Sequence, residues 1–171
     1  RVDMAHGAGG RAMAQLIDEL FARHLDNEWL AQSDDGAVLP APGAGRLVMA
    51  TDSHVVSPLF FPGGDIGCLS AHGTINDVAV MGATPLWLSA AFILEEGFPL
   101  VDLARIVESM AAAAKAAGVP IVTGDTKVVE RGKGDGVFIT TTGVGIVPAG
   151  RELSGSRAQP GDAILVSGTL G

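Results

Sequence analysis

Apolar residues recur every three or four positions in two segments, a spacing typical of amphipathic helices. The segments are residues 11–24 and residues 100–117, and Gly118 ends the second one. The repeated positions are Met13, Leu16, Ile17, Leu20, Phe21, Leu103, Ile106, Val107, Met110 and Ala114. A further helix is predicted from the N-cap residue Asp65 to Met81.

Runs of β-branched or continuously apolar residues predict strands. They lie at 46–56, 86–94, 119–123 and 137–147. Asp52 interrupts the first strand, and because Asp is disfavoured inside strands, a broken local rule of this kind marks a candidate functional position. Gly143 and Gly145 lie two apart on one face of the last strand, where another backbone or a ligand can come close.

The C-terminal part follows a different pattern. After Pro148 comes a polar connector, and residues 161–168 predict one more strand. A domain rarely ends on its first strand. We therefore expect one domain over residues 1–150, while residues 151–171 form a connector and the first strand of a second domain, inside which the chain is truncated.

The composition indicates a packed α/β domain and excludes several functions. Of the 171 residues, 47% are apolar and 24 are glycine, which favours a globular domain with many tight turns. The net charge of -8, without a basic block, argues against nucleic-acid binding. No apolar run approaches the roughly 20 residues of a membrane span. The single cysteine, Cys68, allows no intrachain disulfide, and we expect a cytoplasmic protein.

The candidate chemistry lies in four carboxylates, Asp35, Asp52, Asp77 and Asp125. Each is predicted at a strand end, a turn or a helix face. If they converged they would repel one another unless divalent cations lay between them, and Mg²⁺ favours such oxygens together with substrate phosphates. The pattern favours an ATP-dependent reaction in which Lys127 stabilises developing charge. The spacing alone does not show convergence.

Each position also has a structural interpretation. The segment Ser33–Val38 can be an ordinary Asp-Gly turn, and Asp77 can be a solvated residue of an ordinary helix. The four histidines, His6, His24, His54 and His72, lack a paired spacing typical of zinc and are better explained as structural or solvent-facing.

Five motifs resemble, in order, the N-terminal half of the HypE family of hydrogenase maturation proteins. They are His6–Gly10 (HGAGG), Thr51-Asp52-Ser53, Phe61–Gly67 (FPGGDIG), Gly73–Gly82 (GTINDVAVMG) and Thr123–Lys127 (TGDTK). This family is part of the ATP-using superfamily of aminoimidazole ribonucleotide (AIR) synthetase, selenophosphate synthetase and thiamine-monophosphate kinase. The likeness covers nearly the whole chain.

The resemblance implies a PurM-like N-terminal domain of the α/β (α+β) class, a mixed sheet flanked by helices that pairs with a second copy to form a β-barrel. It implies Mg²⁺ and ATP as cofactors. By position, Asp35, Asp52, Asp77 and Asp125 match metal ligands and also contact the nucleotide together with Gly124 and Thr126. Asp77 and Lys127 match catalytic residues.

The resemblance also implies the reaction: a carbamoyl dehydratase that converts an S-carboxamide on its own C-terminal cysteine to a thiocyanate. This supplies the cyanide ligand of nickel–iron hydrogenase. The implied partners are a second copy of the chain, the HypF carbamoyltransferase and the HypC–HypD complex. The C-terminal half would carry the reacting cysteine, so the fragment alone is expected to be inactive.

Two departures and two alternatives remain. The family often has Lys at the position of Cys68 and Cys at that of His72, which leaves the roles of both open. One alternative is a sister enzyme, selenophosphate synthetase or thiamine-monophosphate kinase. The other is a dimerisation and partner-docking module that uses the turn at Phe60-Phe61 and Trp87 as contacts.

Overall fold

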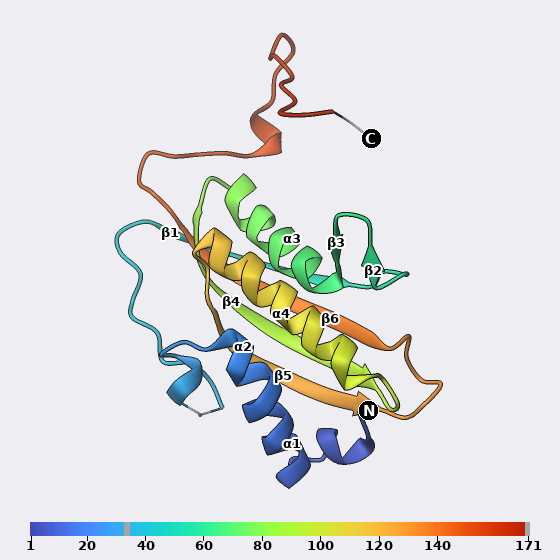
Figure 1. Cartoon of the computed structure of the whole chain (residues 1–171). Helices are drawn as coiled ribbons and strands as arrows, with labels where there is room; N and C mark the ends of the chain where they lie inside the picture. Colours follow the sequence, from blue (N-terminus) through green and yellow to red (C-terminus); the bar gives the residue numbers. More distant parts are fainter. Residues whose placement is uncertain (33–34, 170–171) are drawn as a thin grey trace.

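Helices cover one face of a four-stranded mixed sheet in a computed structural model that describes residues 1–32 and 35–169 (Figure 1). The strand order is β1-β6-β4-β5. β4 runs parallel to β5 and antiparallel to β6, which is antiparallel to β1. The bounds are β1 Arg46–His54, β4 Thr84–Glu95, β5 Ile121–Val129 and β6 Val137–Val147. The predicted α/β class is confirmed.

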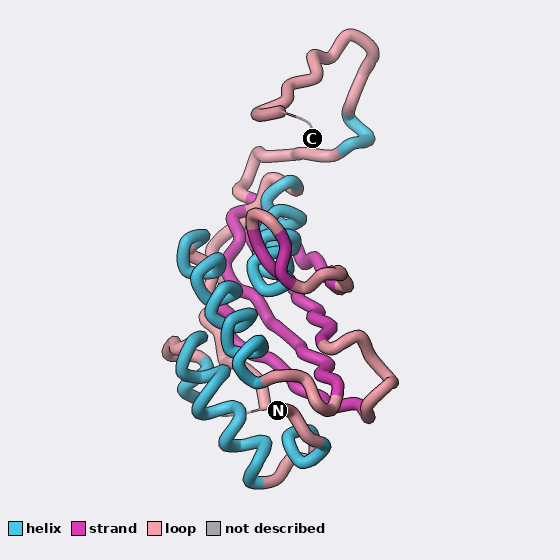
Figure 2. Tube along the Cα trace, turned by 45° about the vertical axis from the view of Figure 1, so that its right-hand side comes forward, coloured by secondary structure: helices cyan, strands magenta, loops and turns pink. Residues whose placement is uncertain are grey.

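The helices α3 and α4 lie side by side on this face (Figures 1 and 2). α3 spans Ile66–Val80, and α4 spans Leu100–Ala117 as predicted. The N-cap prediction is also confirmed, because the Asp65 carboxylate accepts hydrogen bonds from the backbone N–H groups of Gly67 and Cys68.

The N-terminal helical segment packs near β5, at the other side of α4. It comprises α1 (Arg11–Leu16), a π-helical segment (Ile17–Ala22) and α2 (Arg23–Leu25). The shorter elements are the 3-10 turns Met4–Gly7, Leu30–Gln32 and Gly155–Arg157 and a hairpin of β2 (Phe60–Phe61) and β3 (Gly64–Asp65). The core between helices and sheet includes Leu88, Phe92, Ile106, Met110 and Ile139, all at most 2% exposed.

Two glycines of β6 let α3 lie close to the sheet. A Cβ on Gly145 would stand 2.5 Å from Val78 Cγ1, and one on Gly143 would stand 2.9 Å from Val78 Cγ2. The sequence predicts that another backbone or a ligand comes close to these glycines, and in the structure the helix α3 does so. This close approach draws α3 against β6 and the neighbouring β1.

In the part of the chain that the structure describes, no helix lies on the opposite face of the sheet (Figure 2). Alternate residues of the strands point to this open face, including Leu47 (65% exposed), Met49 (75%) and Ile93 (42%). Hydroxyl pairs join two strands here: Ser53 Oγ and Thr140 Oγ1 are 2.9 Å apart, and Thr51 contacts Thr142 in the same way.

Two expectations were wrong. Residues 161–168 do not form a strand; Ile164 and Leu165 are about nine-tenths exposed, because no neighbouring strand pairs with this segment. The strand expected at 119–123 begins at Ile121 and continues to Val129, so the Gly124–Lys127 motif lies inside β5 and not in a turn after it. Pairing with β4 over Ser89–Glu95 extends it. The domain boundary stays a prediction.

Candidate functional site

Asp52 lies near the end of β1 and faces α3. Its Oδ1 accepts a hydrogen bond of 2.8 Å from the backbone N–H of Ser53. Its Oδ2 lies against Gly73 of α3, where a Cβ would stand 3.9 Å away. The tighter neighbour of such a Cβ is the ring of His54, whose Cε1 would stand 3.0 Å away, so Gly73 leaves room for that ring.

Asp77 follows Gly73 by four residues on α3 and is exposed. Residues four apart lie on the same face, about 6 Å along the helix axis. Asp77 is thus placed one turn beyond the point where Asp52 meets the helix. Asp77 therefore lies on the side of α3 that carries Gly73, the residue of this helix that lies against the Asp52 carboxylate.

His54 lies beside both carboxylates and is 7% exposed. Its Nε2 is 3.3 Å from Thr141 Oγ1 and 3.9 Å from Asp52 Oδ2. Burial lowers the pKa of His54 below its ordinary value, and the negative charges of Asp52 and, less strongly, Asp77 act in the opposite direction. The imidazole beside Asp52 therefore lies in surroundings that disfavour its charged form.

Asp125 and Lys127 form an ion pair on β5. Lys127 Nζ donates to Asp125 Oδ1 at 3.1 Å, and both side chains are more than half exposed. The same Asp125 oxygen accepts from the backbone N–H of Thr126 at 2.9 Å. Packing explains the glycine at position 124, because a Cβ there would stand 2.3 Å from the carbonyl oxygen of Ala90 on β4.

The two acidic places are separate in one chain. The pairing registers align Asp52, Thr141, Ala90 and Gly124 in a single row across the sheet. Three strand spacings span about 14 Å, and Asp125 follows Gly124 on the opposite face. Among residues 1–32 and 35–169, no group of three or more His, Cys, Asp or Glu side chains could hold a metal ion.

Other predicted positions are placed as follows. Asp35 is exposed in a bend; Ser33 and Asp34 of the predicted turn lie outside the described residues. Cys68 is half-buried, and its Sγ accepts from the backbone N–H of Asp65 at 3.3 Å, as part of the α3 cap. His72 is exposed on α3. Phe60 is half-buried beneath the Arg105 guanidinium, 4.0 Å from the ring centre.

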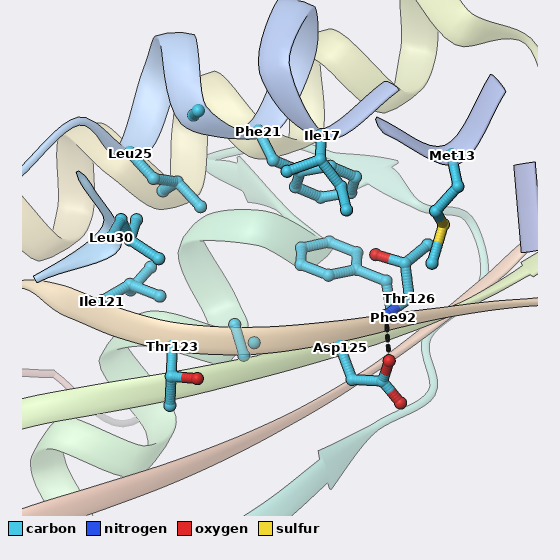
Figure 3. A pocket seen from close by; sticks show the side chains of 13 residues that line it. Met13, Ile17, Phe21, Leu25, Leu30, Phe92, Ile121, Thr123, Asp125 and Thr126 are labelled. Carbon is cyan, nitrogen blue, oxygen red and sulfur yellow. Dashed lines mark hydrogen bonds between the residues drawn. The ribbon is translucent and has the colours of Figure 1, made fainter. Parts of the chain in front are cut away.

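An apolar pocket of about 170 Å³ opens between the N-terminal helical segment and the edge of the sheet (Figure 3). Met13, Ile17 and Phe21 reach toward the sheet from the helical side, and Phe92 meets them from β4. Thr123, Asp125 and Thr126 border the pocket on β5, and the carboxylate of Asp125 points away from the apolar side chains. The pocket thus adjoins the Asp125–Lys127 pair.

The sequence interpretation missed two features of this site. His54 stands two residues after Asp52, a spacing that puts both side chains on one face of a strand. The pocket forms only where the N-terminal helical segment packs on the β5 edge of the sheet, and the sequence does not show this packing. Its apolar residues recur with the spacing of an ordinary helix stripe, so their pattern does not distinguish a pocket lining from a core face.

Comparison with known proteins gives concordant results. The family described as AIR synthase related protein, N-terminal domain, matches residues 33–147. The carbamoyl dehydratase HypE of Cupriavidus necator is 74% identical over 171 residues, which cover all of this chain and 49% of that protein. The chain spans about half the length of the curated relatives it matches.

Two solved structures share the fold. The hydrogenase maturation protein HypE in complex with ATP matches with a TM-score of 0.90 and 53% identity, over 94% of this chain and 48% of that chain. A HypE–HypF complex matches with a TM-score of 0.67 and 54% identity, over 85% and 47%. The predicted PurM-like fold is confirmed. In the described part of this chain, no helix is long and apolar enough to cross a membrane.

Proposed function

The chain belongs to the family of AIR synthase related proteins, of which it carries the N-terminal domain, and from this premise we propose that it is the ATP-binding part of a carbamoyl dehydratase. The observation that carries the proposal is the 74% identity to a carbamoyl dehydratase HypE over the whole chain. The ATP-bound HypE structure with the same fold supports ATP as the nucleotide.

The proposed reaction removes the elements of water from an S-carboxamide. A cysteine thiocarbamate of the form S–C(=O)–NH₂ becomes a thiocyanate, S–C≡N. The carboxamide oxygen attacks the γ-phosphorus of ATP, and ADP leaves. The C–O bond then breaks, so that the oxygen departs with inorganic phosphate, and the two nitrogen-bound protons are released. We place this reaction in the maturation of nickel–iron hydrogenase in the cytoplasm.

Asp52 and Asp77 fit a magnesium ion. Mg²⁺ is bound by one or two carboxylates together with substrate phosphates, and Asp52 on β1 and Asp77 on α3 would supply the two carboxylates. When bound, the ion would neutralise charge on the phosphate oxygens. The exposed position of Asp77 leaves it free to reach a ligand from solvent. Asp35 and Asp125 remain predicted ligands.

The pocket beside β5 suits an aromatic base. Ligand sites for whole small molecules usually measure about 300–1,000 Å³. A pocket of about 170 Å³ lined by Met13, Ile17, Phe21 and Phe92 therefore holds one part of a ligand, such as a purine ring. Asp125 borders the pocket on β5, and its ion pair with Lys127 would then lie near the polar part of the nucleotide.

The partners are also proposals. The open sheet face, with Leu47, Met49 and Ile93 exposed, is the surface that a second copy would cover to form the barrel. A HypE–HypF complex of the same fold supports a carbamoyltransferase of the HypF type as the enzyme that loads the carboxamide. A HypC–HypD-type complex would accept the cyanide.

The test is mass spectrometry of the protein that carries this chain, after carbamoylation by its transferase, before and after Mg-ATP. A C-terminal cysteine whose carboxamide loses one water would support the dehydratase. ATP consumption without such a loss would instead favour the phosphate-transferring sister enzymes.

A matched pair of variants tests the site. Asp77→Asn should weaken Mg-ATP binding at least about tenfold, since even groups that only support metal ligands commonly cost 10–100-fold. Asp102→Asn, which changes a carboxylate of α4 that pairs with Arg105, should bind as the wild type does. Equal affinities for both variants by calorimetry would remove Asp77 from the site.

A further inference from the structure

The strand β5 is an edge strand of the four-stranded sheet and pairs with β4 on one side. The outer side of an edge strand presents backbone N–H and C=O groups that no neighbouring strand satisfies. The N-terminal helical segment packs beside this edge, and the apolar pocket of about 170 Å³ opens between the two (Figure 3). Backbone groups of β5 therefore border the pocket together with apolar side chains.

The pairing with β4 determines which backbone groups of β5 point outward. In a parallel ladder, alternate residues direct both N–H and C=O to the neighbouring strand, and the residues between them direct both away. The carbonyl oxygen of Val129 accepts from Glu96 N–H at 2.8 Å, so Val129 faces β4. The register is unbroken from Thr123 to Val129, and Gly124, an odd number of residues before Val129, therefore faces away. The approach of its Cα to Ala90 of β4 agrees with this direction.

Two outward groups on either side of Gly124 already have side-chain partners. Asn27 donates its side-chain N–H to the carbonyl oxygen of Ile121 at 2.9 Å, and the backbone N–H of Thr126 donates to Asp125 Oδ1 at 2.9 Å. Polar groups from outside the ladder thus satisfy this edge. Among the residues that the structure describes, no side chain or loop bonds to the N–H or C=O of Gly124, which lines the pocket.

We propose that Gly124 determines the specificity for the base: its C=O accepts from the exocyclic amino group of adenine, and its N–H donates to a ring nitrogen beside that group. The inference rests on the proposed function of the pocket as the site of the base. Adenine carries a donor next to an acceptor, and one peptide residue offers the matching acceptor and donor. Guanine has an oxygen in place of the amino group, and in the same orientation this would set two acceptors against each other. Backbone N–H and C=O groups commonly provide the specificity of apolar pockets in this way.

Nucleotide analogues test the inference without changing the protein. Calorimetry compares Mg-ATP with the triphosphates of purine riboside, 1-deazaadenosine and 7-deazaadenosine on the protein that carries this chain. The purine analogue lacks the amino group and should bind about tenfold more weakly, since it leaves the carbonyl oxygen of Gly124 without a partner. Adenine has the ring nitrogens N1 and N7 on either side of its amino group. One deaza analogue should therefore bind about tenfold more weakly and the other as ATP does, which identifies the edge of the base that faces β5.

Amide hydrogen exchange locates the contact in the chain. The N–H of Gly124 should exchange at least about tenfold more slowly when ATP is bound than in the free protein, because a hydrogen bond to the base protects it. This protection should be lost when the weakly binding deaza analogue replaces ATP at a saturating concentration. The N–H of Thr126, which already donates to Asp125, is the control and should exchange at the same rate with both nucleotides.

The outcomes separate the inference from the proposed function. If the protein binds no ATP, the proposed function fails. If it binds ATP and all the analogues with equal affinity, ATP binding stands and base recognition by Gly124 is wrong. If the analogues bind weakly but the N–H of Gly124 exchanges equally fast with and without ATP, another residue recognises the base, and the inference is again wrong.

Discussion

The rings of Phe21 and Phe92 meet edge to face with their centroids 4.9 Å apart, and this contact ties the N-terminal helical segment to the central strand β4. It forms part of the apolar pocket beside Asp125. A residue that enters this pocket from the helix should therefore affect ligand binding with little effect on the sheet.

Ile17→Trp tests the pocket as the site of the base. Ile17 is 40% exposed at the pocket, so a larger ring there can occupy the space without disturbing the buried core. We expect ATP to bind about tenfold more weakly, a loss of about 1.4 kcal/mol, measured by calorimetry. Val101→Trp, at an exposed position of α4 outside the pocket, is the control and should bind ATP normally. Unchanged affinity in Ile17→Trp would place the base elsewhere.

Gly124→Ala tests the packing reason for the glycine of the Gly-Asp-Thr motif. The new Cβ would stand 2.3 Å from the carbonyl oxygen of Ala90, so β5 must move away from β4. Overpacking of this kind costs about 1–3 kcal/mol in the free energy of unfolding. Urea denaturation measures it. Gly43→Ala, where a Cβ meets no atom within 4 Å, should leave stability within about 0.5 kcal/mol. A stable Gly124→Ala protein that no longer binds ATP would instead show that the glycine serves the ligand.

The stability of the charged loop Glu130–Gly136 should depend on pH, because the Glu95 carboxylate holds this loop. The Glu95 carboxylate accepts from the backbone N–H groups of Gly132 (2.5 Å) and Gly136 (3.0 Å), and these bonds hold its pKa below the ordinary value. A lowered pKa in the folded state contributes stability above the unfolded-state pKa, and this stability is lost as the pH falls through the folded-state pKa.

Amide hydrogen exchange checks the expectation for this loop. Protection of Gly132 and Gly136 should be present at neutral pH, fall as Glu95 becomes protonated, and be low at all pH values in Glu95→Gln. The neighbouring variant Glu96→Gln should keep the wild-type profile. Full protection in Glu95→Gln would mean that the loop is held by other contacts.

Local structure could be predicted from the sequence where one segment contains the whole signal. The helix Leu100–Ala117 and the strand Val137–Val147 have the predicted bounds, because a periodic apolar pattern ends in each case at a residue that breaks it. By contrast, the strand through Gly124 was predicted to end early, since the pattern inside the segment does not show that β4 pairs with it as far as Val129.

The sequence indicates which residues are candidates for the site, but it does not show how they lie relative to one another. Asp52 meets α3 at Gly73, four residues before Asp77, and the β6 glycines let α3 approach the sheet, so this arrangement depends on three distant segments at once. Asp125 lies about three strand spacings from Asp52, because β6 and β4 stand between β1 and β5. Nothing in the local pattern specifies that strand order.

The open sheet face provides the last prediction. If a second copy covers this face, Met49, which is 75% exposed in the single chain, becomes buried against the partner. Met49→Lys would then place an unpaired charge inside the interface of both copies. Since breaking a buried ion pair costs about 3–5 kcal/mol, the dimer dissociation constant should rise about 100-fold or more, as measured by sedimentation velocity. Val101→Lys carries the same charge on the helical side, at a site that is 67% exposed, and should leave the dimer intact. If Met49→Lys sediments as the wild type does, the two copies do not meet through this face, and the proposed barrel is wrong.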